Sequence, residues 1–551
     1  MTETALKTGI APNGGVVPKG GVAPMSKRVM NLAHIATQNA RRFGERAGFI
    51  WGERTWSWGE IDAQVSALAA GLRQRGIGKG DRILVHSKNC DAMFVSMFAA
   101  FRLGAVWVPT NFRLLPDEVG YLGTSSGAKA FICHGDFPAH AAAVAASEPA
   151  PEFIWRIGPG EFGEAEVGEV IARHLGEQVA NAAVEHDDPC WFFFTSGTTG
   201  RSKAAVLTHG QMGFVVTNHL ADLVPGSTEV DASLVVAPLS HGAGVHQLVL
   251  SSRGAATILL PTERFDIDEA YRLIERYKIT NIFTVPTILK MLVEHPAVDQ
   301  HDHSSLRHII YAGAPMYRED QKAALGKLGK VLVQYFGLGE VTGNITVLPP
   351  ALHEAQDGPD ARIGTCGFER SGMEVQIQDD AGNAVAPGVQ GEICVIGPAV
   401  FAGYYDNPEA NAKSFRDGWF RTGDLGHMDE QGFVYITGRA SDMYISGGSN
   451  IYPREIEEKI LTHPAIAEVA VLGLPDPVWG EIGVAVCVAR AGASATEAEM
   501  AEYLAAKIAR YKMPKRFFFW EALPKSGYGK VPKRLVRDEL EARGELDWLR
   551  S

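Results

Sequence analysis

From Arg82 onward, short apolar stretches alternate with longer stretches of helical periodicity. In order they read RILVHS, AMFVSMFAAFRLGA, VWVP, PDEVGYLGTSSGA and KAFICHG. Strands that alternate with helices form βα units, in which the strands pair in parallel and the helices cover both faces of the sheet. The sequence therefore predicts an α/β fold with a doubly wound sheet.

A second set of such stretches follows, comprising ATILLP, DIDEAYRLIERYK, NIFTVP, RHIIYAGAP and VLVQYFG. The first 350 residues are thus expected to hold two such layers. Beyond Arg362 the segments GMEVQIQDDAGNAV, GEICVIGP and GFVYITGR alternate and are punctuated by glycine, which is typical of hairpins. We expect the parallel sheet to end there and a mainly β subdomain to follow.

After Gly438 the pattern changes to a compact α+β arrangement, with helices expected in PREIEEKILTH and EAEMAEYLAAKIARY and strands in AEVAVLGLP, GEIGVAVCVAR and RFFFWEA. We therefore predict a large N-terminal domain over residues 26–438 and a small C-terminal domain over residues 439–551. Residues 1–25 have lysines and prolines where a signal peptide would need an apolar core, so they are interpreted as a flexible tail.

The charge balance narrows the function classes. Lys and Arg total 52 against 64 Asp and Glu, a formal net charge of −12, which argues against a nucleic-acid reader. No apolar run approaches the roughly 18 residues of a membrane helix, so no membrane span is expected. The six cysteines are scattered singly without zinc-site spacing, which favours reduced thiols and a cytoplasmic location.

The strongest local signal is WFFFTSGTTGRSKAAVLTHG, from Trp191 to Gly210. An apolar strand runs into a turn rich in glycine and hydroxyl side chains, with Lys203 just beyond. Glycines let backbone N–H groups approach an anion, and a lysine supplies positive charge, so the segment predicts a phosphate cradle. The candidate residues are Thr195, Ser196, Gly197, Thr198, Thr199, Gly200 and Lys203. The spacing is not that of a Walker A loop, and the alternative is a flexible surface loop.

This segment resembles the phosphate loop TSGTTGxPKG of the adenylate-forming superfamily, which comprises acyl-CoA synthetases, adenylation domains and luciferases. Five further segments agree in the same order, namely AGAP at residues 312–315, QYFGLGE at 334–340, GWFRTGDLG at 418–426, GRASDMYISGGSNIYPREIE at 438–457 and PKSGYGK at 524–530. The resemblance implies a mobile C-terminal domain and a two-step reaction. A carboxylate and ATP give an acyl-adenylate and pyrophosphate, and a thiol then takes the acyl group.

The resemblance also implies the roles of individual residues. Lys530 would bridge the carboxylate and the α-phosphate, Glu340 would hold Mg²⁺, and Asp424 would bind the ribose hydroxyls. Arg439 would reach ribose and phosphate from a hinge at about residues 439–442. A wall against adenine would consist of Ala312, Gly313, Ala314, Pro315, Gln334, Phe336 and Gly337. Each of these residues also has a structural alternative, such as a turn aspartate or a hinge salt bridge.

Two further implied sites concern the acid and the thiol. His241 falls where the superfamily places a residue over the acyl pocket, although a histidine near glycines is as readily structural. Members that activate amino acids have an aspartate in this segment, whereas this chain has Leu239-Ser240-His241, so an acid without an amino group is expected. Gly447 and Gly448 match the loop that lines the pantetheine channel, where absent side chains would admit a narrow thiol arm; the alternative is a tight turn.

The chain departs from the family pattern at several positions. Gly339 replaces the usual Thr or Ser before the magnesium glutamate, which suggests that a hydroxyl donor to the α-phosphate is missing. Ser202 and Ala204 replace the proline and glycine that flank the loop lysine. Ser441 stands at the usual hinge position, where Asp or Lys is common, so the hinge is less clearly marked.

The sequence thus indicates an ATP-dependent acyl-CoA synthetase with ATP, Mg²⁺ and coenzyme A as cofactor and cosubstrates. It would act on a small to medium carboxylic acid, with an aromatic acid among the candidates. Two alternatives remain open at this stage: an adenylating ligase that passes the acyl group to an amine or a carrier protein, and a nonenzymatic nucleotide-binding protein of the same fold. The specific acid and a homodimeric state are also left open.

Overall fold

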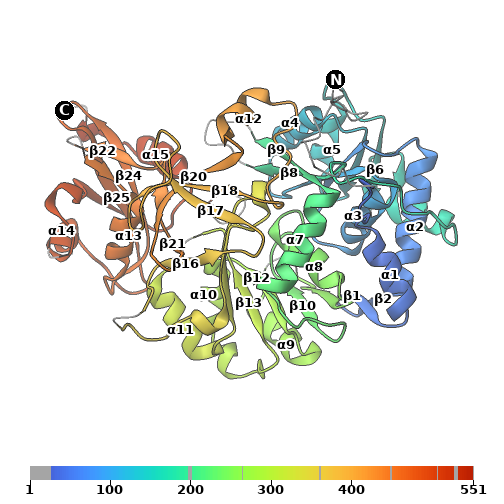
Figure 1. The fold of residues 1–551 in the computed structure, drawn as a ribbon, viewed down its shortest axis with the longest axis horizontal. Helices are drawn as coiled ribbons and strands as arrows, with labels where there is room; N and C mark the ends of the chain where they lie inside the picture. Colours follow the sequence, from blue (N-terminus) through green and yellow to red (C-terminus); the bar gives the residue numbers. More distant parts are fainter. Residues whose placement is uncertain are drawn as a thin grey trace, which may run out of the picture.

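The computed structural model describes residues 26–195, 202–262, 265–314, 316–358, 361–446, 449–505, 507–525 and 531–549. It is a mixed α/β protein with a large N-terminal domain and a separate, smaller C-terminal domain (Figure 1). Three sheets organise the chain, two of them large.

The first sheet has seven strands in the order β7-β6-β5-β3-β4-β8-β9. Its central pairs are parallel, and the hairpin of β8 and β9 adds the antiparallel edge. Its strands are β3 (Arg82–His86), β4 (Val106–Thr110), β5 (Ala130–His134), β6 (Phe153–Ile157), β7 (Ala165–Glu166), β8 (Pro189–Thr195) and β9 (Lys203–Thr208). The predicted βα units therefore form the expected parallel sheet, and the phosphate-cradle segment connects its last two strands.

The second sheet has fourteen strands and contains the second predicted set. Its parallel part runs β14-β13-β12-β10-β11-β1, with β14 (Leu332–Phe336), β13 (His308–Tyr311), β12 (Asn281–Thr284), β10 (Ala232–Val235), β11 (Ala256–Leu259) and β1 (Ala47–Trp51). The hairpin partner β2 (Arg54–Ser57) closes that edge. The N-terminal hairpin thus joins the second sheet although the strands that follow it in sequence form the first.

The mainly β subdomain is continuous with this second sheet. Parallel pairing ends between β14 and β15, before Arg362, because Gln334 pairs antiparallel with Leu348. The added strands are β15 (Thr346–Leu348), β16 (Thr365–Glu369), β21 (Phe433–Arg439), β20 (Trp419–Met428), β18 (Gly391–Ile396), β17 (Glu374–Gln378) and β19 (Phe415–Arg416). The predicted hairpins are therefore present as an extension of an α/β sheet.

Helices pack on both faces of each large sheet, so layers of helices and layers of strands alternate. The largest core joins the two sheets through α2 (Trp58–Gln74), α3 (Asp91–Leu103), α7 (His209–Asp222) and α8 (Gly242–Ser251). The outer face of the first sheet packs on α4 (Pro116–Ser126) and α5 (Pro138–Ala145), and that of the second on α9 (Ile267–Tyr277), α10 (Pro286–Glu294) and α11 (Arg318–Leu328). Helix α1 (His34–Phe43) packs against α2, and α6 (Val167–His174) covers α2 and β6. The doubly wound prediction is confirmed.

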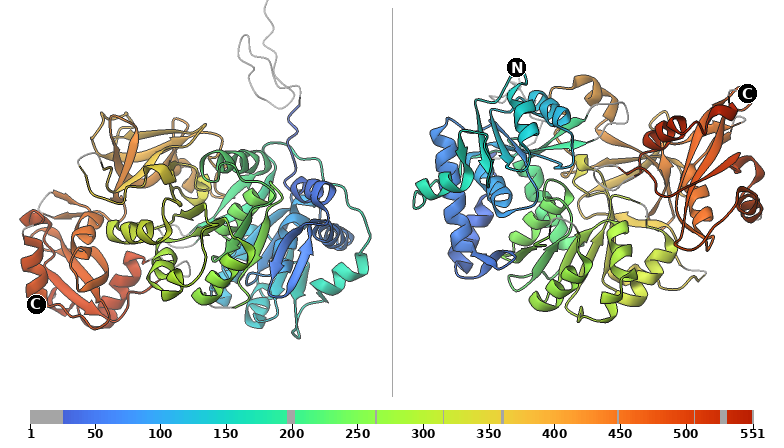
Figure 2. Two further views of the ribbon diagram at one scale, coloured as in Figure 1. Left: turned by 90° about the horizontal axis from the view of Figure 1, so that it is seen from below. Right: turned by 180° about the vertical axis from the view of Figure 1, so that it is seen from behind.

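The C-terminal domain has its own sheet in the order β23-β22-β25-β24, with β26 parallel to β25. The elements are β22 (Tyr444–Ser446), β23 (Ser449–Ile451), α13 (Pro453–Leu461), β24 (Ile466–Asp476), β25 (Gly480–Ala489), α14 (Glu497–Ala505), β26 (Arg516–Trp520) and α15 (Lys533–Ala542). Separate apolar clusters cover its two faces. Figure 2 shows this domain set to one side of the large domain in both views.

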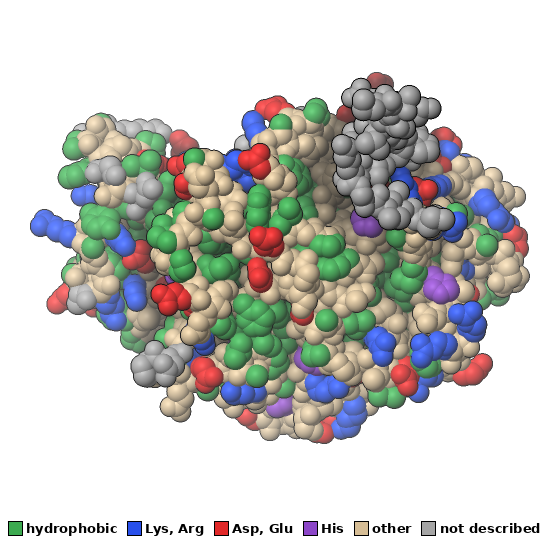
Figure 3. All heavy atoms as spheres, in the orientation of Figure 1, with side chains coloured by type: hydrophobic (Ala, Val, Ile, Leu, Met, Phe, Trp, Pro, Cys, Tyr) green, Lys and Arg blue, Asp and Glu red, His purple; other side chains and the backbone are tan. Residues whose placement is uncertain are grey.

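On the face in Figure 3, acidic and basic side chains are interspersed. Among the described residues, no helix combines the length and the apolar character needed to cross a membrane. All six cysteines are buried and free.

Candidate active site

A buried carboxylate, Glu340, lies where the two large sheets meet. It sits in a short 3-10 turn, Gly339–Val341, directly after β14, and its relative exposure is 5%. Its Oε1 accepts a hydrogen bond of 2.8 Å from the Thr195 hydroxyl and one of 2.9 Å from the Tyr404 hydroxyl. Because both donors contact the same oxygen, the carboxylate is held in one orientation.

Lys203 approaches the same place from the first sheet. It faces Thr195 across the β8–β9 hairpin, at the base of the phosphate-cradle segment. Its Nζ lies 4.4 Å from the centroid of the Tyr404 ring, a cation–π geometry. The structure therefore brings together Thr195, Lys203 and Glu340, which the sequence placed in two distant motifs.

Tyr404 was missed by the sequence reasoning. It belongs to the segment 401–405, which docks against β9 through backbone hydrogen bonds between Val206 and both Ala402 and Gly403, and between Tyr405 and Ala204. The Phe401 N–H also donates to the Glu340 carbonyl at 2.8 Å. An aromatic pair after a glycine carries no catalytic signal in a single sequence, so only the fold reveals this residue.

The packing around Gly339 explains why this position is a glycine. A Cβ atom at this position would lie 2.6 Å from Cδ1 of Phe193 and 2.9 Å from Cγ2 of Thr195. The space of the family's Thr or Ser is therefore filled by two side chains of β8. A larger residue at this position would have to displace Phe193 or Thr195.

His241 borders the same cluster. It is the N-cap residue of α8, and its ring lies 4.3 Å from the Phe193 ring between centroids. The loop before it is tight, because a Cβ on Gly244 would lie 2.0 Å from the Leu239 carbonyl oxygen. Phe193 thus connects His241 to Gly339 and, through it, to Glu340.

The predicted adenine wall lies at the carboxyl ends of β13 and β14. These strands are adjacent and parallel, with Tyr311 opposite Gln334, so the segment 312–314 and residues 336–337 end at the same edge. The Gln334 Oε1 accepts a hydrogen bond of 3.0 Å from the Tyr311 hydroxyl, which orients the amide. Gly313 has a φ of +82°, a conformation that favours glycine.

Two more residues of this wall are fixed by packing. Phe336 ends β14 opposite Thr346. A Cβ on Gly337 would lie 2.3 Å from the Gly343 Cα atom, so the backbone passes too closely for any other residue. Gln334 and Phe336 are two apart on a strand and therefore point to the same face.

Asp424 and Arg439 meet at the end of the β subdomain. They are cross-strand partners on β20 and β21, and the Arg439 Nε lies 2.9 Å from the Asp424 Oδ1. The Asp424 side chain is 6% exposed and that of Arg439 is 41% exposed. The buried carboxylate thus faces a half-exposed cation just before the chain enters the C-terminal domain.

Nine predicted site residues lie outside the described residues: Ser196, Gly197, Thr198, Thr199, Gly200, Pro315, Gly447, Gly448 and Lys530. The structure describes residues that adjoin several of these positions in the sequence. The strands β22 and β23 flank positions 447–448, and Ser446 pairs with Ser449.

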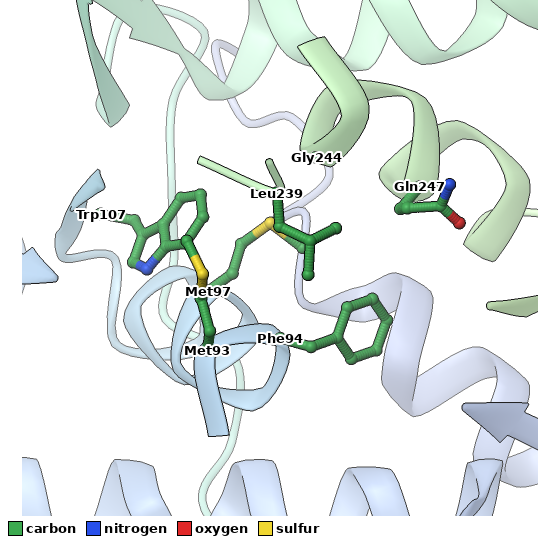
Figure 4. Close-up of a pocket in the computed structure, with 7 residues that line it drawn as sticks. All are labelled: Met93, Phe94, Met97, Trp107, Leu239, Gly244 and Gln247. Carbon is green, nitrogen blue, oxygen red and sulfur yellow. The ribbon is translucent and has the colours of Figure 1, made fainter. Parts of the chain in front are cut away.

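A separate set of apolar side chains packs between α3 and α8. Figure 4 shows Met93, Phe94, Met97, Trp107, Leu239, Gly244 and Gln247 around a narrow space. This space is too narrow to hold a water molecule. We therefore interpret it as core packing behind His241.

The donor set fits a magnesium ion that arrives with a nucleotide. Within the described part of the chain, no group of three or more His, Cys, Asp or Glu side chains is placed to hold a metal. Mg²⁺ is typically bound by one or two carboxylates together with phosphate oxygens and water. A single, firmly oriented carboxylate at Glu340 meets that requirement.

Comparisons with known proteins agree with this geometry. The AMP-binding enzyme family matches residues 36–405, and its C-terminal domain matches residues 455–530. A feruloyl-CoA synthase from Amycolatopsis sp is 36% identical over 483 residues, which is 87% of this chain and 93% of the relative.

Solved structures are similar over nearly the whole chain. ATP-bound MatB from Rhodopseudomonas palustris is 31% identical with a TM-score of 0.82, covering 93% of this chain and 99% of that one. The amide bond synthetase McbA from Marinactinospora thermotolerans is 26% identical with a TM-score of 0.82, covering 92% and 99%. The chain therefore belongs to the AMP-binding enzyme family, within the adenylate-forming superfamily.

Proposed function

We propose that this protein is an ATP-dependent acyl-CoA synthetase that converts a carboxylic acid, ATP and CoA into acyl-CoA, AMP and pyrophosphate. The observation that carries the proposal is the arrangement of Glu340, Thr195 and Lys203 around Tyr404, at the base of the glycine-rich segment. A fixed carboxylate and a lysine beside such a segment suit a bound nucleoside triphosphate.

In the first step, a carboxylate oxygen of the acid forms a bond to the α-phosphorus, and the bond to the bridging oxygen of pyrophosphate breaks. Lys203 would stabilise the charge of the phosphates, the Thr195 hydroxyl would hold Glu340 in place, and Lys530 would bridge the acid and the α-phosphate. Mg²⁺, when bound through Glu340, neutralises phosphate charge as a hard cation. Asp424, Arg439 and the wall of Gln334 and Phe336 would orient the nucleoside.

In the second step, a thiolate attacks the acyl carbon, the new C–S bond forms, and AMP leaves. Gly447 and Gly448 would admit the thiol arm. Because Lys530 and this loop belong to one small domain yet serve different steps, we propose that residues 439–551 rotate as a C-terminal domain. Residues 439–442 would be the hinge, since such gating depends on a few junction residues that change φ and ψ.

The acid we propose lacks an α-amino group, because Leu239-Ser240-His241 supplies no carboxylate to pair with an ammonium. An aromatic acid is the first choice within this class. His241 packs against the Phe193 ring next to the proposed reaction centre, and the feruloyl-CoA synthase named above is a relative of matching length.

An adenylating ligase with an amine acceptor is the second candidate, because the amide bond synthetase resembles this chain over nearly its full length. Both candidates share the first step and differ in the nucleophile of the second. The nonenzymatic alternative is not supported, since the relatives are enzymes. The cytoplasmic location stays a prediction from the sequence, and the oligomeric state stays open.

The test is a panel of carboxylic acids incubated with Mg·ATP, alone, with CoA, or with a primary amine. We expect acid-dependent pyrophosphate release and an acyl-CoA product. The Glu340→Gln variant should lose at least about a hundredfold of this activity, as expected when a charged transition-state contact is removed, while Glu409→Gln, in an exposed ion pair with Lys413, should not. An amide product without acyl-CoA would support the second candidate instead.

A further inference from the structure

The most telling feature outside the predicted motifs is that one side chain contacts both charged residues of the phosphate site. The Tyr404 hydroxyl donates to Glu340, and the face of its ring lies 4.4 Å from the Lys203 Nζ. We propose that Tyr404 is a positioning residue that holds the Glu340 carboxylate for Mg²⁺ and keeps Lys203 apart from it for phosphate. This inference rests on the proposed function, since it concerns the same nucleotide site.

Tyr404 is itself held rigidly. It is 7% exposed and forms an antiparallel bridge with Ala205 of β9. The Asn411 side chain makes two hydrogen bonds with the Tyr404 backbone. Asn411 Oδ1 accepts from the Tyr404 N–H at 2.6 Å, and Asn411 Nδ2 donates to the Tyr404 carbonyl at 3.0 Å. The Phe401 ring packs edge-on against it. A side chain fixed in this way can set the position of its partners.

The hydroxyl acts on Glu340 as a donor. A phenol is protonated at neutral pH, so the Tyr404 hydroxyl has a hydrogen to donate to Glu340. Together with Thr195 it supplies two hydroxyl donors to Oε1. Neither of these bonds uses Oε2, which is then the oxygen oriented for a cation.

The ring acts on Lys203. Opposite charges attract, and a direct ion pair between Lys203 and Glu340 would neutralise both groups before ATP arrives. In the part of the chain that the structure describes, Lys203 has no ion pair, and its ammonium faces the Tyr404 ring. An aromatic face stabilises a cation without supplying a charged oxygen, so phosphate can still recruit the lysine.

The two roles can be separated by substitution. Tyr404→Phe keeps the ring and removes the hydroxyl, so it should impair the positioning of Glu340 but not the contact with Lys203. Tyr404→Leu removes both interactions. Tyr405→Phe is the matched control, because Tyr405 is the next residue and its ring packs on Phe192, away from Glu340 and Lys203.

The experiment measures ATP binding by calorimetry, with excess Mg²⁺ and with EDTA, alongside the Mg²⁺ dependence of pyrophosphate release. For Tyr404→Phe we expect the Mg²⁺ concentration that gives the half-maximal rate to rise about tenfold or more, which is the size expected when a hydrogen bond to a charged group is lost. The ATP affinity measured in EDTA should stay within about twofold, because the ring still faces Lys203. For Tyr404→Leu the affinity in EDTA should fall as well. Tyr405→Phe should match the wild type.

Three results would overturn the proposal: an unchanged Mg²⁺ requirement in Tyr404→Phe, equal loss of ATP affinity with and without Mg²⁺, or the same effect in Tyr405→Phe.

If Tyr404→Phe unfolds at a much lower temperature than the wild type, Asn411→Ala replaces it in the test. This change removes the side chain that holds the Tyr404 backbone, so it should also raise the Mg²⁺ requirement. ATP binding is measured by calorimetry without an acid substrate. If no acid in the panel reacts, that result contradicts the proposed function but does not affect the test of Tyr404.

Discussion

Asp424 and Arg439 face each other across two antiparallel strands, with 2.9 Å between Oδ1 and Nε. The buried carboxylate belongs to the β subdomain, and the arginine is the last residue of β21 before the turn that leads to the C-terminal domain. The proposed ribose contact and the proposed hinge are therefore adjacent, so nucleotide binding and domain movement can share one ion pair.

Asp424→Asn is expected to weaken use of ATP. The change removes a charge and one acceptor oxygen, and hydrogen bonds of charged groups contribute about 1.5–3 kcal/mol, which corresponds to roughly tenfold to a hundredfold in kcat/KM for ATP. Steady-state kinetics with varied ATP would measure it. An unchanged KM for ATP together with unchanged kcat would remove Asp424 from the nucleotide site.

Gly339→Ala should damage the site by crowding. The new Cβ would meet the Phe193 ring at 2.6 Å, a contact that forces β8 to shift next to Thr195 and Glu340. We expect a large fall in pyrophosphate release, and a larger one for Gly339→Thr. Gly326→Ala is the control, because nothing lies within 4 Å of a Cβ there. A faster Gly339→Thr enzyme would show that the space is open after all.

Ser441→Pro should separate the two half-reactions. The Asp442 N–H donates to the Arg439 carbonyl at 3.0 Å, so Ser441 is the third residue of a turn. Proline is disfavoured at this position of a type I turn and restricts the residue before it. We expect adenylate formation or thioester formation to collapse while the other persists. Assays of each step would check this, and two rates within a few-fold of wild type would place the hinge elsewhere.

Buried histidines predict a loss of stability in mild acid. Burial, with a smaller contribution from nearby His308, lowers the pKa of His246 to about 3. The unfolded chain takes up this proton near pH 6.5, whereas the folded chain does not. Stability is therefore complete above about pH 6.5 and falls as the pH drops toward 3.

Thermal unfolding at pH 7.5 and pH 5 measures this effect. His246→Leu should reduce the difference between the two midpoints, and His186→Gln, at an exposed position, should leave it unchanged. An identical difference in His246→Leu and wild type would exclude His246 as a source of the pH dependence.

Local periodicity in the sequence is enough to predict most helices and strands, but not which strands pair with one another. The units from β3 to β5 and from β11 to β14 follow directly from apolar and amphipathic patterns. The placement of β1 beside β11, some 200 residues away, depends on packing between the two sheets, which no local pattern encodes.

The same limit applies to the site. Motif resemblance predicted Thr195, Lys203 and Glu340, and the fold brings them together. It could not predict Tyr404, whose importance comes from a long-range contact, and it could not explain Gly339, because the sequence does not show that Phe193 lies where a side chain would be. Glycines are explained by what lies next to them, which requires coordinates.

The most direct test of the central claim follows an oxygen atom. An aromatic acid labelled with ¹⁸O in both carboxylate positions would be incubated with Mg·ATP and CoA, and the products analysed by mass spectrometry. Attack of the carboxylate on the α-phosphate predicts AMP with one ¹⁸O and acyl-CoA with the other. Unlabelled AMP, or ADP with labelled inorganic phosphate, would contradict an acyl-adenylate pathway.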